Sequence, residues 1–475
     1  MGINENHTWF CFKNLSSKKY NMINTVHIGI GFTLLFFGFN SGQNFAVKLF
    51  GNLGSISLAI LYCSYSFCNL LAPSIISVLK SPRLAVALGA CIYTIYILQF
   101  VYVIPWFIYI YSIIQGLGSG LLWAAQGIYI NDCSTEDDRG QKAGLFWALF
   151  MMSNVLGNLA CFFIIRVFPI EGVAHDGWND NCSLLFLILG SISILGCLLL
   201  FILRKPYNVG EAIQSRLLDK EKAAETSLNA SENATTLSGE VKEVEEGFIQ
   251  RLKCMFETLK DVKMWLLLPL IFSSGYSAVF IASHYSRQIV NTELIGICMC
   301  IYGIVEVIFS YIMGYVSDHW GNTVCIVTGV VCQLISLIVS VFADSEQNWL
   351  IYVPAVFFGI ADCSFNTQLM TLCGQLFSKY VDASFAALRM FQSLGSTLCF
   401  FLAPLFVSAG AVIATHDNYI IEVIVSGVIC IFGFLFYLIL ACKYGTNWNP
   451  AKIDDNKRIM RASSSFNTIP INNVL

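Results

Sequence analysis

The sequence predicts an all-α membrane protein with twelve transmembrane helices in two six-helix bundles. Of its 475 residues, 56% are hydrophobic and 12% are charged, whereas soluble domains carry about 25% charged residues. Apolar stretches of about 20 residues, long enough to cross a bilayer as helices, recur along the chain, and one long polar stretch divides them into two sets. This composition excludes a soluble enzyme, and the net charge of −3 gives no sign of nucleic-acid binding.

Twelve apolar stretches can be counted. They cover residues 24–47, 55–79, 84–104, 107–131, 144–165, 183–203, 264–286, 294–316, 323–343, 349–373, 384–410 and 419–442. Of the 27 basic and 30 acidic residues, only Glu306, Asp362, Arg389 and Glu422 lie inside these stretches. The stretches contain Gly and Ser without the strict alternation of membrane β-strands, so helices are favoured over a barrel.

The polar segments divide the chain into five parts. These are an N-terminal tail (1–23), a first six-helix bundle (24–203), a linker (204–263), a second bundle (264–442) and a C-terminal tail (443–475). The centre of the linker is rich in Ser, Thr, Asn, Ala and Glu, which is typical of disorder. Six spans, a linker and six more spans form the major facilitator pattern, in which two bundles face a central cavity.

The basic residues predict the orientation in the membrane. Lys and Arg concentrate in the tails, the linker and the loops on the same side, whereas the opposite side holds only Lys48, Arg166 and Arg287. Because basic residues favour the cytosolic side, both termini and the linker are expected to be cytosolic. Asn181, in the sequon Asn181-Cys182-Ser183 of the longest outer loop, is the expected glycosylation site.

Polar side chains gather in the spans that begin each three-helix repeat. In a facilitator fold these spans line the cavity. The candidates for ligand binding are Asn40, Gln43, Asn44, Gln126, His284, Asp362, Asn366 and Gln368 in these spans, together with Glu306 in the span 294–316. A hydrated pocket for a small polar or ionic solute is one interpretation of these residues. Interhelical hydrogen bonding by amides and hydroxyls is the other.

The intramembrane ions also leave two alternatives open. Counted along their helices at 1.5 Å per residue, Glu306 and Asp362 lie at similar depth, with Arg389 about 8–9 Å nearer the cytosol. An Asp362–Arg389 ion pair would join two helices as a structural contact. A proton- or ion-coupled site would instead use Glu306 or Asp362 as the titrating group.

One loop motif matches the facilitator pattern, and no motif indicates catalysis. Gly314, Asp318 and Gly321 fit a Gly-x-x-x-Asp-x-x-Gly loop, in which the carboxylate would accept from helix N-terminal amides and latch one conformation. Most of the 18 cysteines lie in apolar spans, where Cys acts as a small hydrophobe. We find no phosphate-binding, nucleophile or metal motif, so we expect no catalytic residues, no metal, no cofactor and no enzyme activity.

Several spans contain sequence motifs that are similar to those of a known family. The segments are GFTLLFFGFNSGQN (31–44), QGLGSGLLWAAQGIY (115–129), GIADCSFNTQ (359–368) and ALRMFQSLG (387–395). The chain resembles the uncoordinated-ninety-three (unc-ninety-three) family, the ion-channel regulatory branch of the major facilitator superfamily, and is closer to its shorter homolog A type.

The resemblance implies a regulator of ion transport that associates with a potassium channel of the two-pore type in the lipid bilayer. A secondary transporter of a small solute or ion is the alternative, and a trafficking chaperone for membrane receptors is the second. The plasma membrane is the expected location, with an endolysosomal membrane as the alternative.

Overall fold

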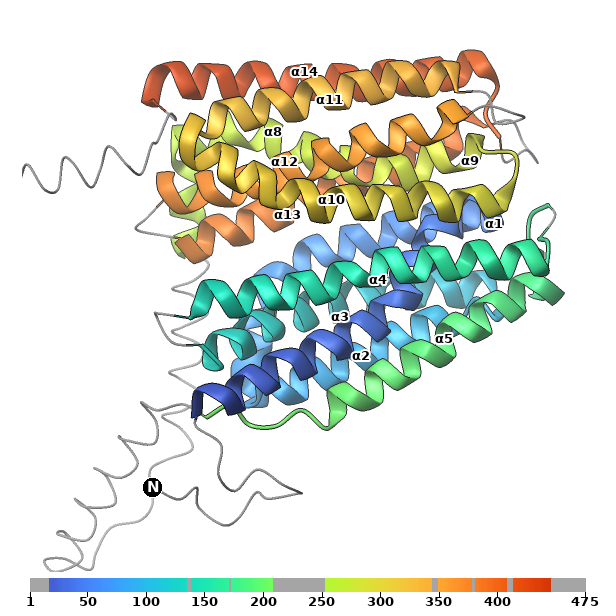
Figure 1. The fold of residues 1–475 in the computed structure, drawn as a ribbon, viewed down its shortest axis with the longest axis horizontal. Coiled ribbons are helices and arrows are strands. Elements are labelled where there is room, and N and C mark those ends of the chain that lie inside the picture. Colours follow the sequence, from blue (N-terminus) through green and yellow to red (C-terminus); the bar gives the residue numbers. More distant parts are fainter. Residues whose placement is uncertain are drawn as a thin grey trace, which may run out of the picture.

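The fold is built from long helices in two groups. In this computed structural model the described residues are 17–134, 138–170, 172–207, 253–343, 349–377, 381–407 and 413–445. Figure 1 shows α1 to α5 gathered together and α8 to α14 stacked above them. We call these the N-terminal group and the C-terminal group.

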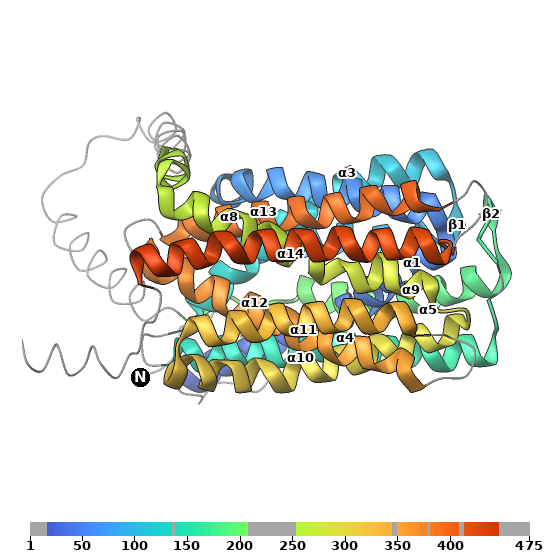
Figure 2. The same cartoon turned by 90° about the horizontal axis from the view of Figure 1, so that it is seen from above.

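The N-terminal group contains five long helices. They are α1 (Ser17–Leu79), α2 (Pro82–Leu98), α3 (Pro105–Asp132), α4 (Arg139–Val167) and α5 (Asp180–Phe201). Two short antiparallel strands, β1 (Tyr102–Val103) and β2 (Gly177–Trp178), pair at one end of the molecule, opposite the end where α1 begins (Figure 2). We call this the β-strand end.

The C-terminal group combines long helices with short 3-10 and π segments. In chain order these are α8 (Val262–Phe280), the π-helix η2 (Ile281–Tyr285), α9 (Ser286–Gln288), α10 (Thr292–Trp320), α11 (Asn322–Phe342), the 3-10 helix η3 (Trp349–Tyr352), α12 (Val353–Leu376), α13 (Val381–Leu402), the 3-10 helix η4 (Ala403–Phe406) and α14 (His416–Tyr444).

The described residues include ten helices long and apolar enough to cross a membrane, so the protein is an integral membrane protein. Two features separate this number from the twelve expected. Residues 24–47 and 55–79 belong to the single element α1, which bends at Gly51, where φ is 54°. Only a residue without a side chain adopts this backbone easily. The third expected span is α2, which has 17 residues.

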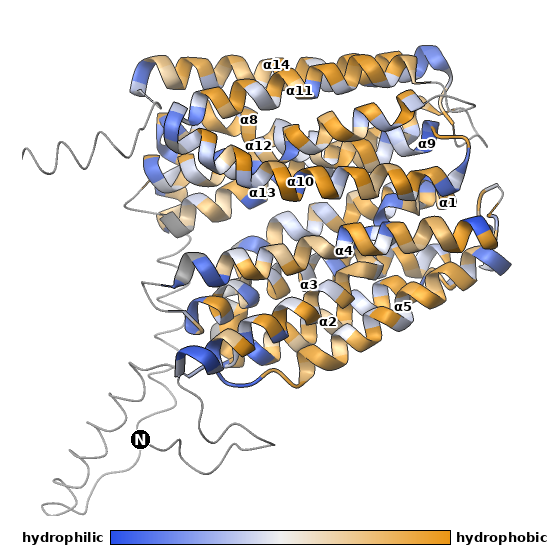
Figure 3. Cartoon of the chain, viewed as in Figure 1, coloured by the Kyte–Doolittle hydropathy of each residue, from blue (hydrophilic) through white to orange (hydrophobic). Residues whose placement is uncertain are grey.

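Hydrophobic residues predominate along the lengths of the helices (Figure 3). Large side chains such as Val167, Tyr311 and Leu405 are 68%, 85% and 69% exposed. A soluble protein rarely leaves such an apolar belt uncovered, whereas a lipid environment covers it.

Some helix ends differ from the sequence-based boundaries. α1 begins at Ser17, so part of the expected tail 1–23 is helical, because hydropathy marks depth in the membrane and not helix ends. The Asn21 side chain pairs with the Tyr207 backbone through two 2.9 Å hydrogen bonds, which hold the first residues of the expected linker against α1. The rest of the linker up to residue 252 and the C-terminal tail beyond 445 lie outside the described residues.

The expected Gly314–Gly321 loop is helical along almost its whole length. α10 continues through Gly314 to Trp320, and Gly321 alone joins it to α11, with φ of 88°. The prediction of a loop is therefore wrong for Gly314 and Asp318, because a single glycine with positive φ is enough to reverse the chain. The side chain of Asp318 lies outside the described residues.

The two groups meet mainly along two helix pairs, α1 with α13 and α4 with α10. On α10, a Cβ atom at Gly296 would lie 2.6 Å from the backbone oxygen of Asn158 on α4. A glycine therefore allows these two backbones to approach closely, as small residues do between membrane helices.

Candidate functional site

Two buried carboxyl groups lie next to each other where the groups meet. Glu306 on α10 is 8% exposed and Asp362 on α12 is 7% exposed. Each carboxyl lies within electrostatic range of the other. Tyr302, one helical turn before Glu306, donates a 2.9 Å hydrogen bond to Asp362 Oδ2. Asp362 Oδ1 has no hydrogen-bond partner in the described part of the chain.

The expected Asp362–Arg389 ion pair does not form among the described side chains. Arg389 on α13 instead donates to Gln392 Oε1 at 3.3 Å. Gln392 donates to Asn366 Oδ1 at 3.0 Å, and Asn366 lies near Asp362. The amides of Gln392 and Asn366 therefore lie between Arg389 and Asp362. Arg389 reaches Gln392 because the two residues are three apart on the same helix face.

The N-terminal group faces this region with tyrosines of α1. Tyr62 stacks on Phe400 of α13 with ring centroids 5.7 Å apart and lies within electrostatic range of Asp362. Tyr65 lies within the same kind of range of Arg389. We call the region formed by Glu306, Asp362, Asn366, Arg389 and Tyr62 the central polar site.

Of three amides expected in the cavity, two bind the neighbouring helix α4 and the third binds a tyrosine of its own helix, α1. Asn40 donates to Ser153 Oγ and Asn44 donates to Asn158 Oδ1, each at 3.1 Å, and both bonds join α1 to α4. Gln43 accepts a 2.8 Å hydrogen bond from Tyr62, across the bend in α1. These contacts match the structural interpretation of membrane amides.

Gln126 and Gln368 also lie inside helix groups. Gln126 is buried on α3. The Ser317 hydroxyl on α10 lies 3.1 Å from Gln368 Oε1 on α12 and 2.9 Å from Asn322 Oδ1 on α11, so its single proton is available to either acceptor. Gln368 therefore belongs to a contact between three helices of the C-terminal group.

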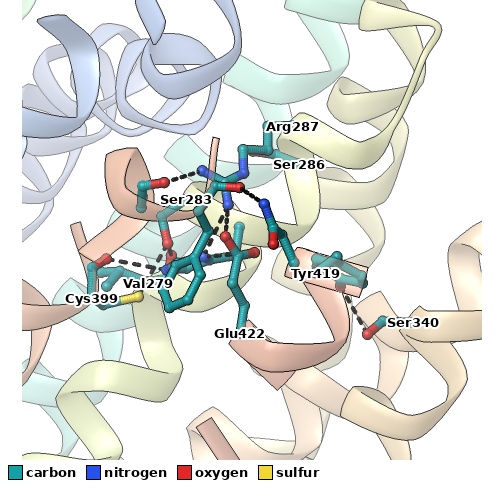
Figure 4. A network of polar contacts seen from close by, with 12 residues as sticks. Val279, Ser283, Ser286, Arg287, Ser340, Cys399, Tyr419 and Glu422 are labelled. Atoms are coloured by element: carbon teal, nitrogen blue, oxygen red, sulfur yellow. Dashed lines mark hydrogen bonds and ion pairs between the residues drawn. The ribbon is translucent and has the colours of Figure 1, made fainter. Parts of the chain in front are cut away.

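His284 contacts a separate ion pair, formed by Arg287 and Glu422, which Figure 4 shows from close by. Its Nδ1 lies 3.0 Å from Glu422 Oε2 on α14, and its Nε2 lies 3.1 Å from the Cys399 carbonyl on α13. Arg287 on α9 forms an ion pair with Glu422 and donates to the Ala403 carbonyl at 2.6 Å. We call His284, Arg287 and Glu422 the buried charge cluster.

The buried charge cluster also contacts the N-terminal group. Lys48 on α1 is 8% exposed and donates a 3.1 Å hydrogen bond to the Arg287 carbonyl. The helices around the cluster pack on α1 through η2, α9 and η4. The contact therefore joins the two groups at a place away from the central polar site.

Sequence reasoning placed His284 in the cavity and missed the pairing of Arg287 with Glu422. Arg287 follows the expected span 264–286 and Glu422 lies near the start of the span 419–442. Both positions are at the same side of the membrane in the expected topology, and that shared depth was the signal that could have paired them.

The fold matches solved transporters. A xylose transporter, XylE from E. coli, in a partially occluded inward-open conformation, superposes with a TM-score of 0.60 at 14% identity, covering 89% of this chain and 98% of that one. The nucleoside transporter NupG gives a TM-score of 0.57 at 13% identity over 89% and 99% of the two chains. The chain is therefore a multi-pass membrane protein with the transporter fold of the major facilitator class.

The sequence comparisons identify the family. The family described as "Ion channel regulatory protein UNC-93" matches residues 49–435, and the chain belongs to this family. "UNC93-like protein MFSD11" from Xenopus laevis is 25% identical over 425 residues, which cover 82% of this chain and 91% of that protein. "Protein unc-93 homolog A" from Homo sapiens is 24% identical over 416 residues, covering 79% and 86%.

Proposed function

We propose that this protein regulates ion transport as a non-enzymatic accessory subunit of a two-pore potassium channel. The family match over residues 49–435 is the observation that carries this proposal. Three of the nine candidate polar residues support it, because Asn40, Asn44 and Gln368 form hydrogen bonds with neighbouring helices.

The test is co-expression with two-pore potassium channels in cells that lack both proteins. We expect the chain to change the potassium current and to co-precipitate with the channel. The Asp362→Asn variant should keep this effect, since a regulator does not depend on flux through the central polar site. Unchanged currents together with no co-precipitation would contradict the proposal.

Secondary transport of a small solute or ion is the second candidate, and Glu306 with Asp362 favours it. Intramembrane acids between helix groups often mark ion or substrate pathways. Purified protein in proteoliposomes would then move solute, and Asp362→Asn would stop the flux while the protein still reaches the membrane. Glu293→Gln, at the first turn of α10, is the control on the helix that carries Glu306.

The proposed topology has twelve spans in two bundles, with both termini in the cytosol and the plasma membrane as the location. It treats the two sides of the Gly51 bend in α1 as separate spans and α2 as a further one. This topology places the first turn of α5, with Asn181, on the outer side.

Glycosylation tests this orientation. The amide of Asn181 donates a 2.7 Å hydrogen bond to the Pro169 carbonyl, which has to open for a glycan to be attached. We expect a glycan that Asn181→Gln removes. A glycan on Asn229 or Asn233, in the linker, would contradict the proposed orientation.

A further inference from the structure

The charge balance at Glu306 and Asp362 differs from that of the other buried ions. In the described part of the chain, neither carboxyl has a Lys, Arg or His side chain within ion-pair distance, whereas Glu422 pairs with Arg287 and Asp138 pairs with Lys142. Both acids are more than nine-tenths buried. Asp362 Oδ1 is buried without a partner there.

Two adjacent buried carboxylates repel each other and lose their hydration, so both are not expected to be ionised together. One proton between them removes one charge and the repulsion. The remaining negative charge is then stabilised by the Tyr302 hydroxyl, which donates to Asp362 Oδ2 at 2.9 Å.

We propose that Glu306 and Asp362 form a carboxyl pair that binds one proton at the boundary between the two helix groups. The proton is shared between the carboxyl groups of Asp362 and Glu306, and Asp362 Oδ1 has no hydrogen-bond partner in the described part of the chain. This site is additional to channel regulation and does not depend on it.

The surroundings of the pair favour a proton over a metal ion. Among the described residues, no group of three or more His, Cys, Asp or Glu side chains could hold a metal. The other titratable and charged groups near the pair come from four helices. They are Tyr302 on α10, Cys363 on α12, Tyr62 on α1 and Arg389 on α13.

Arg389 affects the pair at a distance and does not replace the proton. Its guanidinium is held by Gln392, and Gln392 is held in turn by Asn366 and by Ser274 on α8. Arg389 does not contact either carboxyl group, so it does not neutralise the pair. Its positive charge acts from a distance and favours one negative charge on the pair.

Infrared spectroscopy of the purified full-length protein in lipid tests the proposal directly. At neutral pH we expect the C=O stretching band of a protonated carboxyl group, with a deuterium shift. The band should be lost in the Glu306→Gln/Asp362→Asn variant and retained at full intensity in Glu293→Gln. The wild-type band should fall as the pH is raised, while carboxylate absorption increases by the same amount.

Three results would overturn the proposal. These are the absence of the band from the wild-type protein, an unchanged band in the double variant, and loss of the band when sodium is raised at constant pH. The last result would mean that the pair holds sodium instead. If the double variant fails to fold, the single variants Glu306→Gln and Asp362→Asn each test it, because removing either partner should shift the frequency of the band. None of these readouts involves a channel, so they are independent of the proposed regulatory function.

Discussion

The buried charge cluster and the central polar site differ in how their ionisable groups are paired. At the cluster, Arg287 and Glu422 meet directly and His284 contacts the same carboxylate. At the central polar site, two acids are neighbours and the nearest arginine, Arg389, contacts a glutamine instead. Opposite charges in contact satisfy each other and hold helices together. Like charges in contact require a proton or another positive charge from outside the chain. The central polar site is therefore the better candidate for ligand binding.

The largest effect is expected from Glu422→Gln. This change leaves the Arg287 guanidinium buried without an anion, and breaking a buried ion pair from one side costs about 3–5 kcal/mol. The apparent free energy of unfolding in detergent should fall by that amount, and Glu293→Gln should leave it within about 0.5 kcal/mol of wild type. Equal stability of Glu422→Gln and wild type would show that the cluster is not structural.

A double variant sharpens the comparison. Arg287→Met/Glu422→Leu removes both charges together, and apolar replacement of a whole buried ion pair is often neutral or stabilising. We expect the free energy of unfolding of the double variant to be at least about 2 kcal/mol above that of Glu422→Gln. The loss of the hydrogen bond from Arg287 to the Ala403 carbonyl reduces this gain. Denaturation curves of the two variants measured in parallel give the difference. A double variant no more stable than the single one would mean that Glu422 acts through contacts other than Arg287.

The smallest change in stability is expected at the central polar site. Asp362→Asn removes one of two neighbouring acids and keeps an oxygen that can accept from Tyr302, so the unfolding free energy should change by less than about 1 kcal/mol. The same denaturation assay measures it. A loss as large as that of Glu422→Gln would remove the distinction between the two regions.

Local sequence patterns predicted the helices well, because hydropathy and length are properties of one segment at a time. Each expected apolar stretch overlaps a described helix, and the four charges inside the stretches are evident from the sequence alone. Bends were harder to predict. A single positive φ at Gly51 or Gly321 redirects the chain, and neither residue differs in hydropathy from glycines that remain helical.

The sequence by itself determined that this is a membrane protein and which segments are apolar enough to span the membrane. It also determined that few charged residues lie within those segments. Only the tertiary structure decided which groups meet: Glu422 with Arg287, Arg389 with Gln392, and Asp362 with Tyr302 and Glu306. Partner choice depends on how each helix is rotated and tilted against its neighbours. That rotation is fixed by close contacts such as Gly296 against Asn158, between residues far apart in the chain.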